Sequence, residues 1–250
     1  MTFRSSSSSA ASRFGPAARV VAGGLGLAAA GYATWAGLAW YRYGQASKAK
    51  GDAADPLLDH FMPEFEVVER HHLGIAAPAE VVLAAAKEQN LIGSPVVRAI
   101  FKTRALVMGA TPAEVPAHGL LSQVLALGWG VLADTPGEMV LGAVARPWEA
   151  DVAFKAVPPD EFAGFNEPGY VKIIWSLRAD PVSSVRSVFR TETRATATDP
   201  LARTKFRRYW ALSSAGIALI RLLSLPPLKA DAERRWREAT HVGEPVAATR

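Results

Sequence analysis

The 250-residue chain contains no cysteine, and this absence removes several classes of site at once. Without thiols there is no disulfide framework, no thiolate zinc site and no cysteine nucleophile. The chain also lacks GxSxG, GxxxxGK and GxGxxG sequences, so triad hydrolases, P-loops and dinucleotide-binding folds have no support. The charged fraction of 20% together with seven tryptophans excludes a disordered chain.

Charge is missing altogether from the 21 positions between Val20 and Trp40. A helix of that length spans roughly 30 Å, the thickness of the hydrocarbon core of a bilayer. Tryptophan and tyrosine gather at its distal end, at Trp35, Trp40, Tyr41 and Tyr43, and aromatic side chains favour the membrane interface. The sequence therefore predicts a single transmembrane helix over residues 20–43.

A secretory signal peptide and a buried soluble helix are the two alternatives for this run. The run is longer than the usual apolar region of a signal peptide, and bulky aromatic residues occupy the expected cleavage zone. Arginines and lysines flank it on both sides in nearly equal number, so its orientation in a membrane is undetermined. The serine-rich residues before it are expected to form a disordered leader.

Beyond a small, polar linker, the first half of the predicted domain alternates between strand and helix patterns. Alternation over 65–76 predicts a strand with one mostly apolar face, formed by Phe65, Val67, Glu69, His71 and Leu73. Helices are predicted at 79–90, after Pro78, and at 95–106, after Gly93-Ser94.

The second half is predicted to be mostly antiparallel. Apolar runs at 121–133 and 138–145, joined by an Asp-Thr-Pro-Gly turn, predict a hairpin. Further strands are predicted at 152–157, 170–178 and 187–198, with a helical turn at 160–165 between them. Asp199-Pro200 predicts the start of a long helix, which Pro226-Pro227 is expected to interrupt. The apolar stretch 211–225 is short and contains Arg221, which favours a packed helix over a second membrane span.

This order of elements, with the phrases FEVVERHHLGIAAPAEVVLAAA, GWGVLADTPGEMVLGAV and SVFRTETRATATDPLARTKFRRYW, resembles the START-like superfamily, also called SRPBCC or helix-grip proteins. The resemblance covers about residues 64–235. It implies an α+β domain in which a curved antiparallel sheet wraps around a long C-terminal helix and encloses an apolar cavity. Members typically bind lipids or other hydrophobic ligands, and a minority are cyclases or hydrolases. The membrane helix and the Pro226-Pro227 pair depart from the family pattern.

Large aromatic residues are the candidates for the walls of such a cavity, because their rings combine apolar area with polar edges. The alternative for each of them is an ordinary place in the core. The candidate ligand-binding residues are Trp129, Trp148, Phe154, Trp175, Phe206, Tyr209 and Trp210.

No metal site or cofactor is expected. His71 and His72 are adjacent in a predicted strand and point to opposite faces, so they cannot hold one ion together. An acid–base site is conceivable at His71, His118, Asp134, Glu149 or Asp151, but a surface or capping role is favoured for each; catalytic residues therefore remain unknown. The basic segment 203–208 suits either anionic headgroups or plain solvent exposure, and no nucleic-acid module is present.

Together these patterns predict a membrane-tethered START-like domain that binds a hydrophobic small molecule or lipid in an apolar cavity. The alternatives are a polyketide cyclase/dehydrase-type enzyme with an acid or base in the cavity, and a structural domain with a filled core. Oligomeric state, ligand identity and cleavage of the N-terminal segment stay open. The predicted divisions are a leader (1–19), a transmembrane helix (20–43), a linker (44–59), the START-like domain (60–238) and a disordered tail (239–250).

Overall fold

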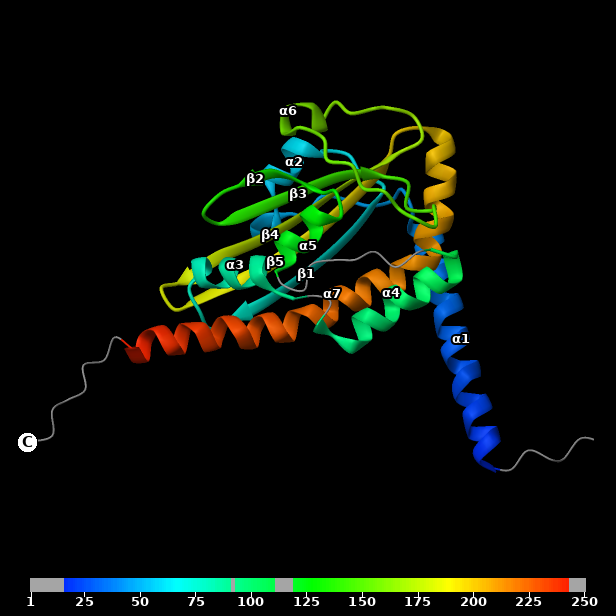
Figure 1. Cartoon of the computed structure of the whole chain (residues 1–250), viewed down its shortest axis with the longest axis horizontal. Helices are drawn as coiled ribbons and strands as arrows, with labels where there is room; N and C mark the ends of the chain where they lie inside the picture. Colours follow the sequence, from blue (N-terminus) through cyan, green and yellow to red (C-terminus); the bar gives the residue numbers. More distant parts are fainter. Residues whose placement is uncertain (1–15, 91–92, 111–118, 243–250) are drawn as a thin grey trace, which may run out of the picture.

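The structure is a computed structural model that describes residues 16–90, 93–110 and 119–242 (Figure 1). Its helices are α1 (Pro16–Arg42), the short 3-10 helix η1 (Gly51–Ala53), α2 (Pro56–Phe61), α3 (Ala79–Glu88), α4 (Pro95–Met108), α5 (Leu120–Ala126), α6 (Pro159–Phe162) and α7 (Pro200–Val242). Its strands are β1 (Val67–Ile75), β2 (Gly130–Asp134), β3 (Glu138–Ala145), β4 (Val171–Ser183) and β5 (Arg186–Ala197). Most of the predicted disordered leader (1–19) and tail (239–250) lie outside the described residues, but residues 16–19 belong to helix α1 and residues 239–242 to helix α7, so disorder was predicted wrongly there.

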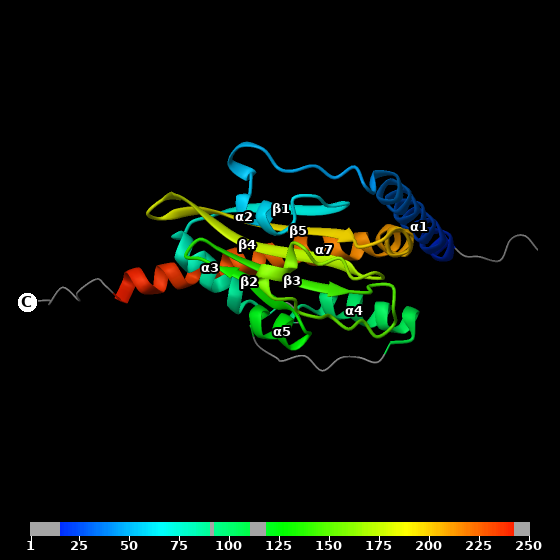
Figure 2. The same cartoon turned by 90° about the horizontal axis from the view of Figure 1, so that it is seen from above.

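The five strands form one antiparallel sheet in the order β1-β5-β4-β3-β2 (Figure 2). The predicted strands at 65–76, 170–178 and 187–198 are confirmed as β1, β4 and β5, and the predicted hairpin is confirmed as β2 and β3. The long helix α7 runs beneath the sheet toward the C-terminus (Figure 1). An α+β domain with an antiparallel sheet and a long C-terminal helix is therefore present.

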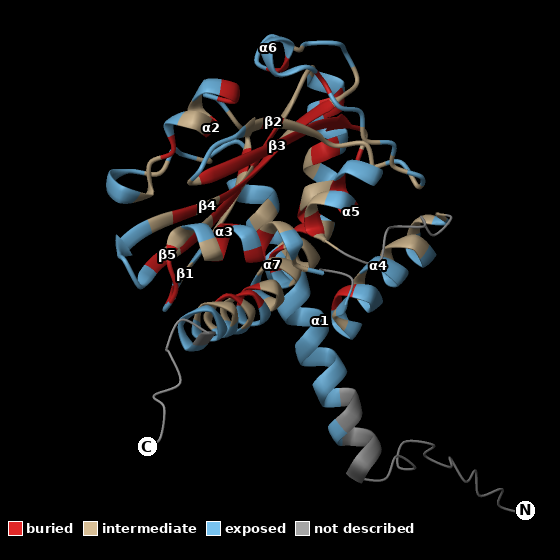
Figure 3. Ribbon diagram, turned by 60° about the vertical axis from the view of Figure 1, so that its left-hand side comes forward, coloured by how far each residue is buried: buried red, intermediate tan, exposed pale blue. Residues whose placement is uncertain are grey.

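Each face of the sheet has its own apolar cluster. On the face covered by α7, here called the inner face, Leu141, Trp175 and Leu177 pack with side chains of α3, α5 and α7. On the outer face, Val140 and Ile174 pack with α2 and with side chains around α6. Buried residues accordingly concentrate in the strands, whereas α1 is mostly exposed (Figure 3).

The predicted interruption of the last helix at Pro226-Pro227 is wrong, because α7 continues through both residues. Proline removes a backbone donor and usually breaks a helix. Here burial outweighs that cost, since Leu225 and Leu228, on either side of the pair, are held against the sheet. Figure 1 shows that α7 bends further upstream, so that its gold and orange parts run in different directions.

The stretch predicted to be a linker is partly structured and docked. Asp55 caps α2 by accepting a hydrogen bond from the backbone N–H of Leu58 at 2.9 Å, and Pro56 follows at the first helical position. Leu58 is completely buried on the outer face of the sheet. The packed part of the chain therefore begins at least four residues before the predicted boundary at residue 60.

Two further strand predictions are wrong in part. Residues 120–126 form helix α5, because Leu120, Gln123 and Val124 are buried at helical spacing. A short apolar run does not distinguish a helix from a strand by periodicity alone. The predicted strand 152–157 makes only one isolated bridge among the described residues, between Lys155 and Val144.

The predicted membrane segment forms the exposed helix α1, with Val20 75% and Leu27 78% exposed. Within the described residues, however, the helix that is long and apolar enough to cross a membrane is the C-terminal one, over Pro200–His241. Length and apolar character therefore do not support the membrane span predicted at the N-terminus. Ser214, Ala218 and Ala232 of α7 are buried, so a crossing by α7 would remove them from the domain.

Candidate functional site

Polar side chains interrupt the apolar inner face near its middle. The register pairs Glu69 of β1 with Thr193 of β5, and Thr193 with Trp175 of β4, so the three point to the same face. The next inward-facing row pairs His71 with Thr191. We call Glu69, His71, Trp175, Thr191, Thr193 and Arg221 the inner polar patch. Convergent polar groups in apolar surroundings are typical of small-molecule sites.

Arg221 brings a positive charge to this patch from α7. It belongs to the stripe of α7 that contains the buried residues Ala218 and Leu225. Its guanidinium carbon lies 3.6 Å from the ring centroid of Trp175, and Nη2 donates a hydrogen bond to Oγ1 of Thr193 at 3.2 Å. Loss of hydration on burial lowers the pKa of Arg221 to about 9, against the opposing effect of the Glu69 carboxylate. The arginine remains charged at neutral pH.

Glu69 and His71 form a pair beside this arginine. Oε2 of Glu69 lies 3.3 Å from Nε2 of His71, and both side chains are mostly buried. Nε2 of His71 has no hydrogen-bond partner among the described residues, because the geometry of the Glu69 contact falls outside the limits of a hydrogen bond. A buried imidazole next to a carboxylate can exchange a proton with a ligand.

Thr191 fixes the orientation of the Trp175 side chain. Nε1 of Trp175 donates to Oγ1 of Thr191 at 2.7 Å, and that hydroxyl donates to the backbone carbonyl of Ser176 at 2.9 Å. This chain of bonds holds the indole in one orientation. The ring face of Trp175 is thereby presented to Arg221.

The predicted ligand-binding aromatic residues fall into two groups, one that includes Trp175 of the patch and one at the start of α7. Trp129 lies between Phe154, at 5.4 Å between ring centroids, and Trp175, at 6.4 Å. The second group surrounds the start of α7 and contains Trp148, Phe206, Tyr209 and Trp210. Phe206 is buried, and its ring centroid is 6.0 Å from that of Trp210.

Two pockets are hollowed into the described part of the molecule near α7. The larger, of about 370 Å³, lies between α7 and the segment from α3 to α4, and it is lined by Gln89, Asn90, Gly93, Ser94, Val97, Leu223, Ser224 and Pro227. The smaller, of about 190 Å³, lies by the N-terminus of α7 and includes Arg146, Trp148 and Lys205. Of the predicted aromatic residues, only Trp148 lines either of these two pockets.

Most of the other acid–base candidates lie away from the patch. Asp134 pairs with Lys87 at 2.7 Å, and Glu149 pairs with Arg146 at 3.6 Å, both on the surface. Asp151 is exposed, and His118 lies outside the described residues. Of the candidates within the described residues, the structure brings only His71 to the inner polar patch.

The basic segment 203–208 contacts the rest of the chain at several points. Arg203 forms an ion pair with Glu66 at 2.8 Å, and Arg207 donates to the backbone carbonyl of Trp40 at 2.9 Å while lying over its ring. The contacts of Arg207 join the end of α1 to the start of α7, and the ion pair of Arg203 joins α7 to the residue before β1. Arg208 is exposed.

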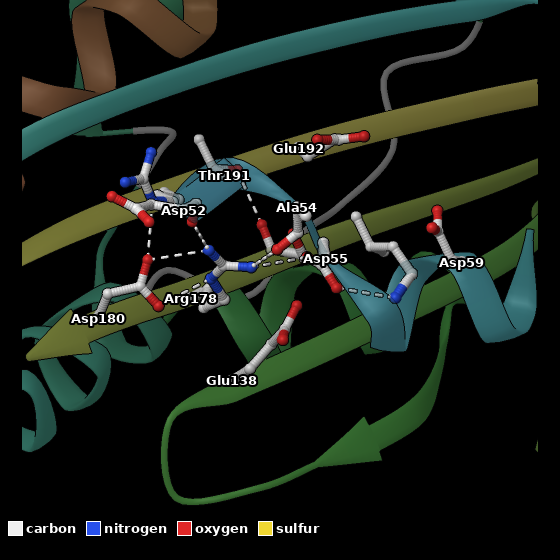
Figure 4. A network of polar contacts seen from close by, with 12 residues as sticks. Asp52, Ala54, Asp55, Asp59, Glu138, Arg178, Asp180, Thr191 and Glu192 are labelled. Atoms are coloured by element: carbon white, nitrogen blue, oxygen red, sulfur yellow. Dashed lines mark hydrogen bonds and ion pairs between the residues drawn. The ribbon is translucent and has the colours of Figure 1, made fainter. Parts of the chain in front are cut away.

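A second set of charges lies on the outer face, beneath α2 (Figure 4). Arg178 is held by Asp180 at 2.9 Å, by Asp55 at 3.8 Å and by the carbonyl of Ala54 at 2.7 Å. Burial raises the pKa of the neighbouring Glu138 to about 9, and the nearby Asp55 carboxyl adds to the rise. Neither pocket described above includes these residues. We assign this network to holding α2 on the sheet.

Arg194 extends the outer network. Only 1% of its side chain is exposed, and it bonds Asp59 and Glu192, both at 2.6 Å. Its guanidinium also lies 4.5 Å from the ring centroid of Phe65. Through these contacts a strand near the C-terminus holds the segment that the sequence predicts to be a linker. Within the described ranges, no group of three or more histidine, aspartate or glutamate side chains could hold a metal ion.

A scan against models of protein families and a search of curated proteins both found no match. Among solved structures, a conserved protein from Geobacillus kaustophilus shares 11% identity over 69% of this chain and 97% of its own, with a TM-score of 0.31. Norcoclaurine synthase from Thalictrum flavum shares 12% identity over 62% of this chain and 93% of its own, at a TM-score of 0.27. The Zhui aromatase/cyclase from Streptomyces sp. R1128 shares 14% sequence identity over 68% of this chain and 94% of its own, with a TM-score of 0.23. Likeness at this level assigns no activity to the chain.

Sequence reasoning found part of the patch and missed its centre. The alternation of β1 correctly placed Glu69 and His71 with apolar neighbours, which is an unusual position for charged side chains. In the sequence, Arg221 stands out only as a charge that disfavours a membrane span. A lone arginine in an apolar helical stretch is itself a signal, because a buried charge requires a partner. The threonines of β5 carried no distinguishing signal.

Proposed function

We propose that this chain is a membrane-tethered helix-grip protein of the START-like type that binds a hydrophobic small molecule or lipid between its sheet and α7. The observation that carries the proposal is the inner polar patch, a small charged and hydroxylated area within an otherwise apolar interface. An apolar ligand would gain its affinity from burial, while a few polar contacts would fix its orientation.

The tether in this proposal is α1. Support comes from the exposed apolar side chains at Val20, Leu25 and Leu27, and from the absence of charge between Val20 and Trp40. Hydrogen bonds from Tyr32 to the carbonyl of Leu212, at 2.6 Å, and from Trp35 to Ser214, at 3.0 Å, hold its second half against α7. The ligand site would thus stay close to the bilayer.

A second candidate function is an acid–base enzyme of the cyclase/dehydrase type. The observation that favours it is the Glu69–His71 pair beside a cation, which supplies a proton carrier and a group that can stabilise developing negative charge. In this alternative, His71 would move the proton and Arg221 would polarise a carbonyl oxygen.

Native mass spectrometry of the full chain, released from mild detergent micelles, tests the binding proposal. We expect a co-purifying lipid or aromatic molecule at about one per chain. Thr193→Leu, which removes the hydroxyl that Arg221 bonds, should abolish the added mass. Thr204→Leu, the same substitution at an exposed position in the first turns of α7, is the control and should retain the added mass.

The outcomes separate the three functions. A bare chain that takes up no hydrophobic compound from a lipid extract would support the filled-core alternative and contradict binding. Bound material that leaves chemically altered after incubation, with the change lost in His71→Gln, would favour the enzyme. Bound material that leaves unaltered supports the binding function.

A further inference from the structure

The helix α4 leaves most of its apolar side chains uncovered. Val97 is its only buried residue, whereas Phe101, Leu106 and Val107 are exposed, the last two by 84% and 78%. Single exposed apolar residues are common on soluble proteins, but several on one short helix mark an interaction surface. The uncovered part of α4 therefore suits contact with an apolar partner.

The neighbouring stretch of α7 is exposed in the same way. Leu212, Leu219 and Leu222 are exposed and lie on one side of the helix, at spacings of seven and three residues. A separate stripe, which includes Ala218 and Leu225, is buried in the domain. Only 28% of the most apolar 18-residue stretch of α7 is buried. This helix is thus apolar on its packed side and on its exposed side.

The exposed residues of the two helices belong to one surface. Gly216 of α7 lies directly against α4, because a Cβ atom at this position would be 3.3 Å from Cγ2 of Ile100. Further along, Val97 of α4 and Leu223 of α7 line the same pocket. Both helices lie below the sheet in Figures 1 and 3. We define the apolar platform as Phe101, Leu106 and Val107 of α4 with Leu212, Leu219 and Leu222 of α7.

Charge around the apolar platform has one sign. The helix α4 contains Arg98, Lys102 and Arg104 but no acidic residue, and α7 has no acidic residue over 200–230. Lys102 and Arg208 are exposed. Cations beside an exposed apolar surface are typical of helices that lie in the interface of a membrane with anionic lipids.

The position of α1 indicates where such a membrane would lie. Its second half is bonded to α7, from Tyr32 to the carbonyl of Leu212 and from Trp35 to Ser214. Toward its N-terminus, α1 projects from the same side of the domain as α4 and α7 (Figures 1 and 3). The uncharged run of α1 extends to Trp40, about 12 Å beyond Tyr32 along the helix. A bilayer crossed by α1 would therefore reach the apolar platform, at a depth comparable to the roughly 5–10 Å of interfacial helices.

We infer that the apolar platform docks α4 and α7 into the interface of an anionic bilayer. The inference goes beyond the proposed ligand-binding function and shares with it only the tether α1. It also accounts for the composition of α7, which is apolar enough to cross a membrane and yet keeps Ala218 and Ala232 buried in the domain. A helix that lies in the interface meets lipid on one side only.

The absence of cysteine allows docking to be measured at single positions. Leu106→Cys and Leu219→Cys, each labelled with an environment-sensitive fluorophore, report on the apolar platform. The control is Ala163→Cys, at an exposed position after α6, on the opposite side of the domain from α4 (Figure 1). The full-length variants are reconstituted in vesicles of equal parts phosphatidylglycerol and phosphatidylcholine. A spin label on the lipid chains should quench both platform positions roughly two- to threefold more strongly than the control.

A change of charge tests whether the bilayer must be anionic. In vesicles of phosphatidylcholine alone, quenching at Leu106→Cys should fall by at least about half, since each basic side chain near an anionic surface corresponds to roughly fivefold in affinity. Lys102→Gln combined with Arg208→Gln should lower the quenching in the anionic vesicles as well. Lys155→Gln, which removes an exposed charge just before α6, is the control and should not lower it.

A change of apolar character tests the platform itself. Leu106→Asp combined with Val107→Asp should remove the quenching at Leu219→Cys, because the carboxylates would be repelled by anionic lipids and would lose hydration in the interface. Both side chains are exposed, so the variant should keep the far-UV circular dichroism of the wild type. Ala163→Asp is the matched control and should leave the quenching unchanged.

Docking and the tether can fail separately, because a label at Leu27→Cys reports on α1. Quenching at Leu27→Cys with none at Leu106→Cys would overturn the inference and leave the tether intact. Quenching at Leu106→Cys with none at Leu27→Cys would contradict the tether and support docking. Protection of the Leu106→Cys label from aqueous iodide without quenching by lipid would mean that a protein surface covers the platform, and would overturn the inference. Equal quenching in anionic and neutral vesicles would overturn the assignment to an anionic bilayer.

Discussion

Glu138 is expected to make the stability of this protein fall as the pH rises. Its carboxyl is buried against the sheet, and one of its oxygens has no hydrogen-bond partner among the described residues. Burial, together with the nearby Asp55, raises its pKa from the ordinary 4.5 to about 9. The folded protein therefore keeps this proton up to about pH 9, whereas the unfolded chain releases it near pH 4.5. Stability is thus unaffected by Glu138 below pH 4.5 and decreases between these two values.

Glu138→Gln replaces the carboxyl by a neutral amide and should remove this pH dependence. Each pH unit above 4.5 corresponds to about 1.4 kcal/mol, so the penalty that the variant avoids at pH 7 is roughly 3 kcal/mol. For a chain of this size, that corresponds to a melting temperature about 6–12 °C higher than that of the wild type. At pH 4.5 the two proteins should melt within about 2 °C of each other.

Thermal unfolding followed by circular dichroism between pH 4.5 and 8.5 measures this difference. Glu64→Gln, at an exposed position, is the matched control and should follow the wild type at every pH. A gap between Glu138→Gln and the wild type that stays constant with pH would refute the reasoning. So would a gap that narrows as the pH rises.

Three further substitutions test the packing. Gly128→Ala should lower the free energy of unfolding by about 2–4 kcal/mol, because Gly128 has a φ of +98° and an added methyl group would overlap a backbone carbonyl. The control Gly74→Ala places its methyl group in open space and should cost under about 1 kcal/mol in the same melting experiment. Arg194→Met removes the buried cation that Asp59 and Glu192 share, although Lys48 and Arg70 still pair with them, and should cost about 1–3 kcal/mol by chemical denaturation; an unchanged midpoint would contradict the assigned role. Asp55→Ala removes the cap of α2 and should lower the free energy of unfolding by about 1–2 kcal/mol. Backbone amides of residues 58–61 should then exchange hydrogen faster than in the wild type.

Local periodicity was sufficient to predict most of the individual strands and the β2–β3 hairpin, though not the order of strands in the sheet. Alternation along β1 also placed Glu69 and His71 on one face. The helix α7 follows from its Asp199 cap and its helical spacing. These features depend on residues within one element, and such information is present in a single sequence.

Features that depend on distant partners could not be predicted in the same way. The helix α2 has only six residues, and it stays folded because Arg178 and Arg194, more than 110 residues away, bond Asp55 and Asp59. The continuity of α7 through Pro226 depends likewise on the sheet beneath it. The patch itself unites residues of β1, β4, β5 and α7, and only the fold brings them together.

The pairing of β1 with β5 imposes an order on the folding of the chain. Every strand partner of β1 lies between Ser187 and Ala195, more than 110 residues further along. During synthesis, Glu69 and His71 remain in water until β5 has been made, and they lose that water only when α7 closes over them. Desolvation of the patch is therefore a late event, which a nascent chain ending before residue 197 cannot reach.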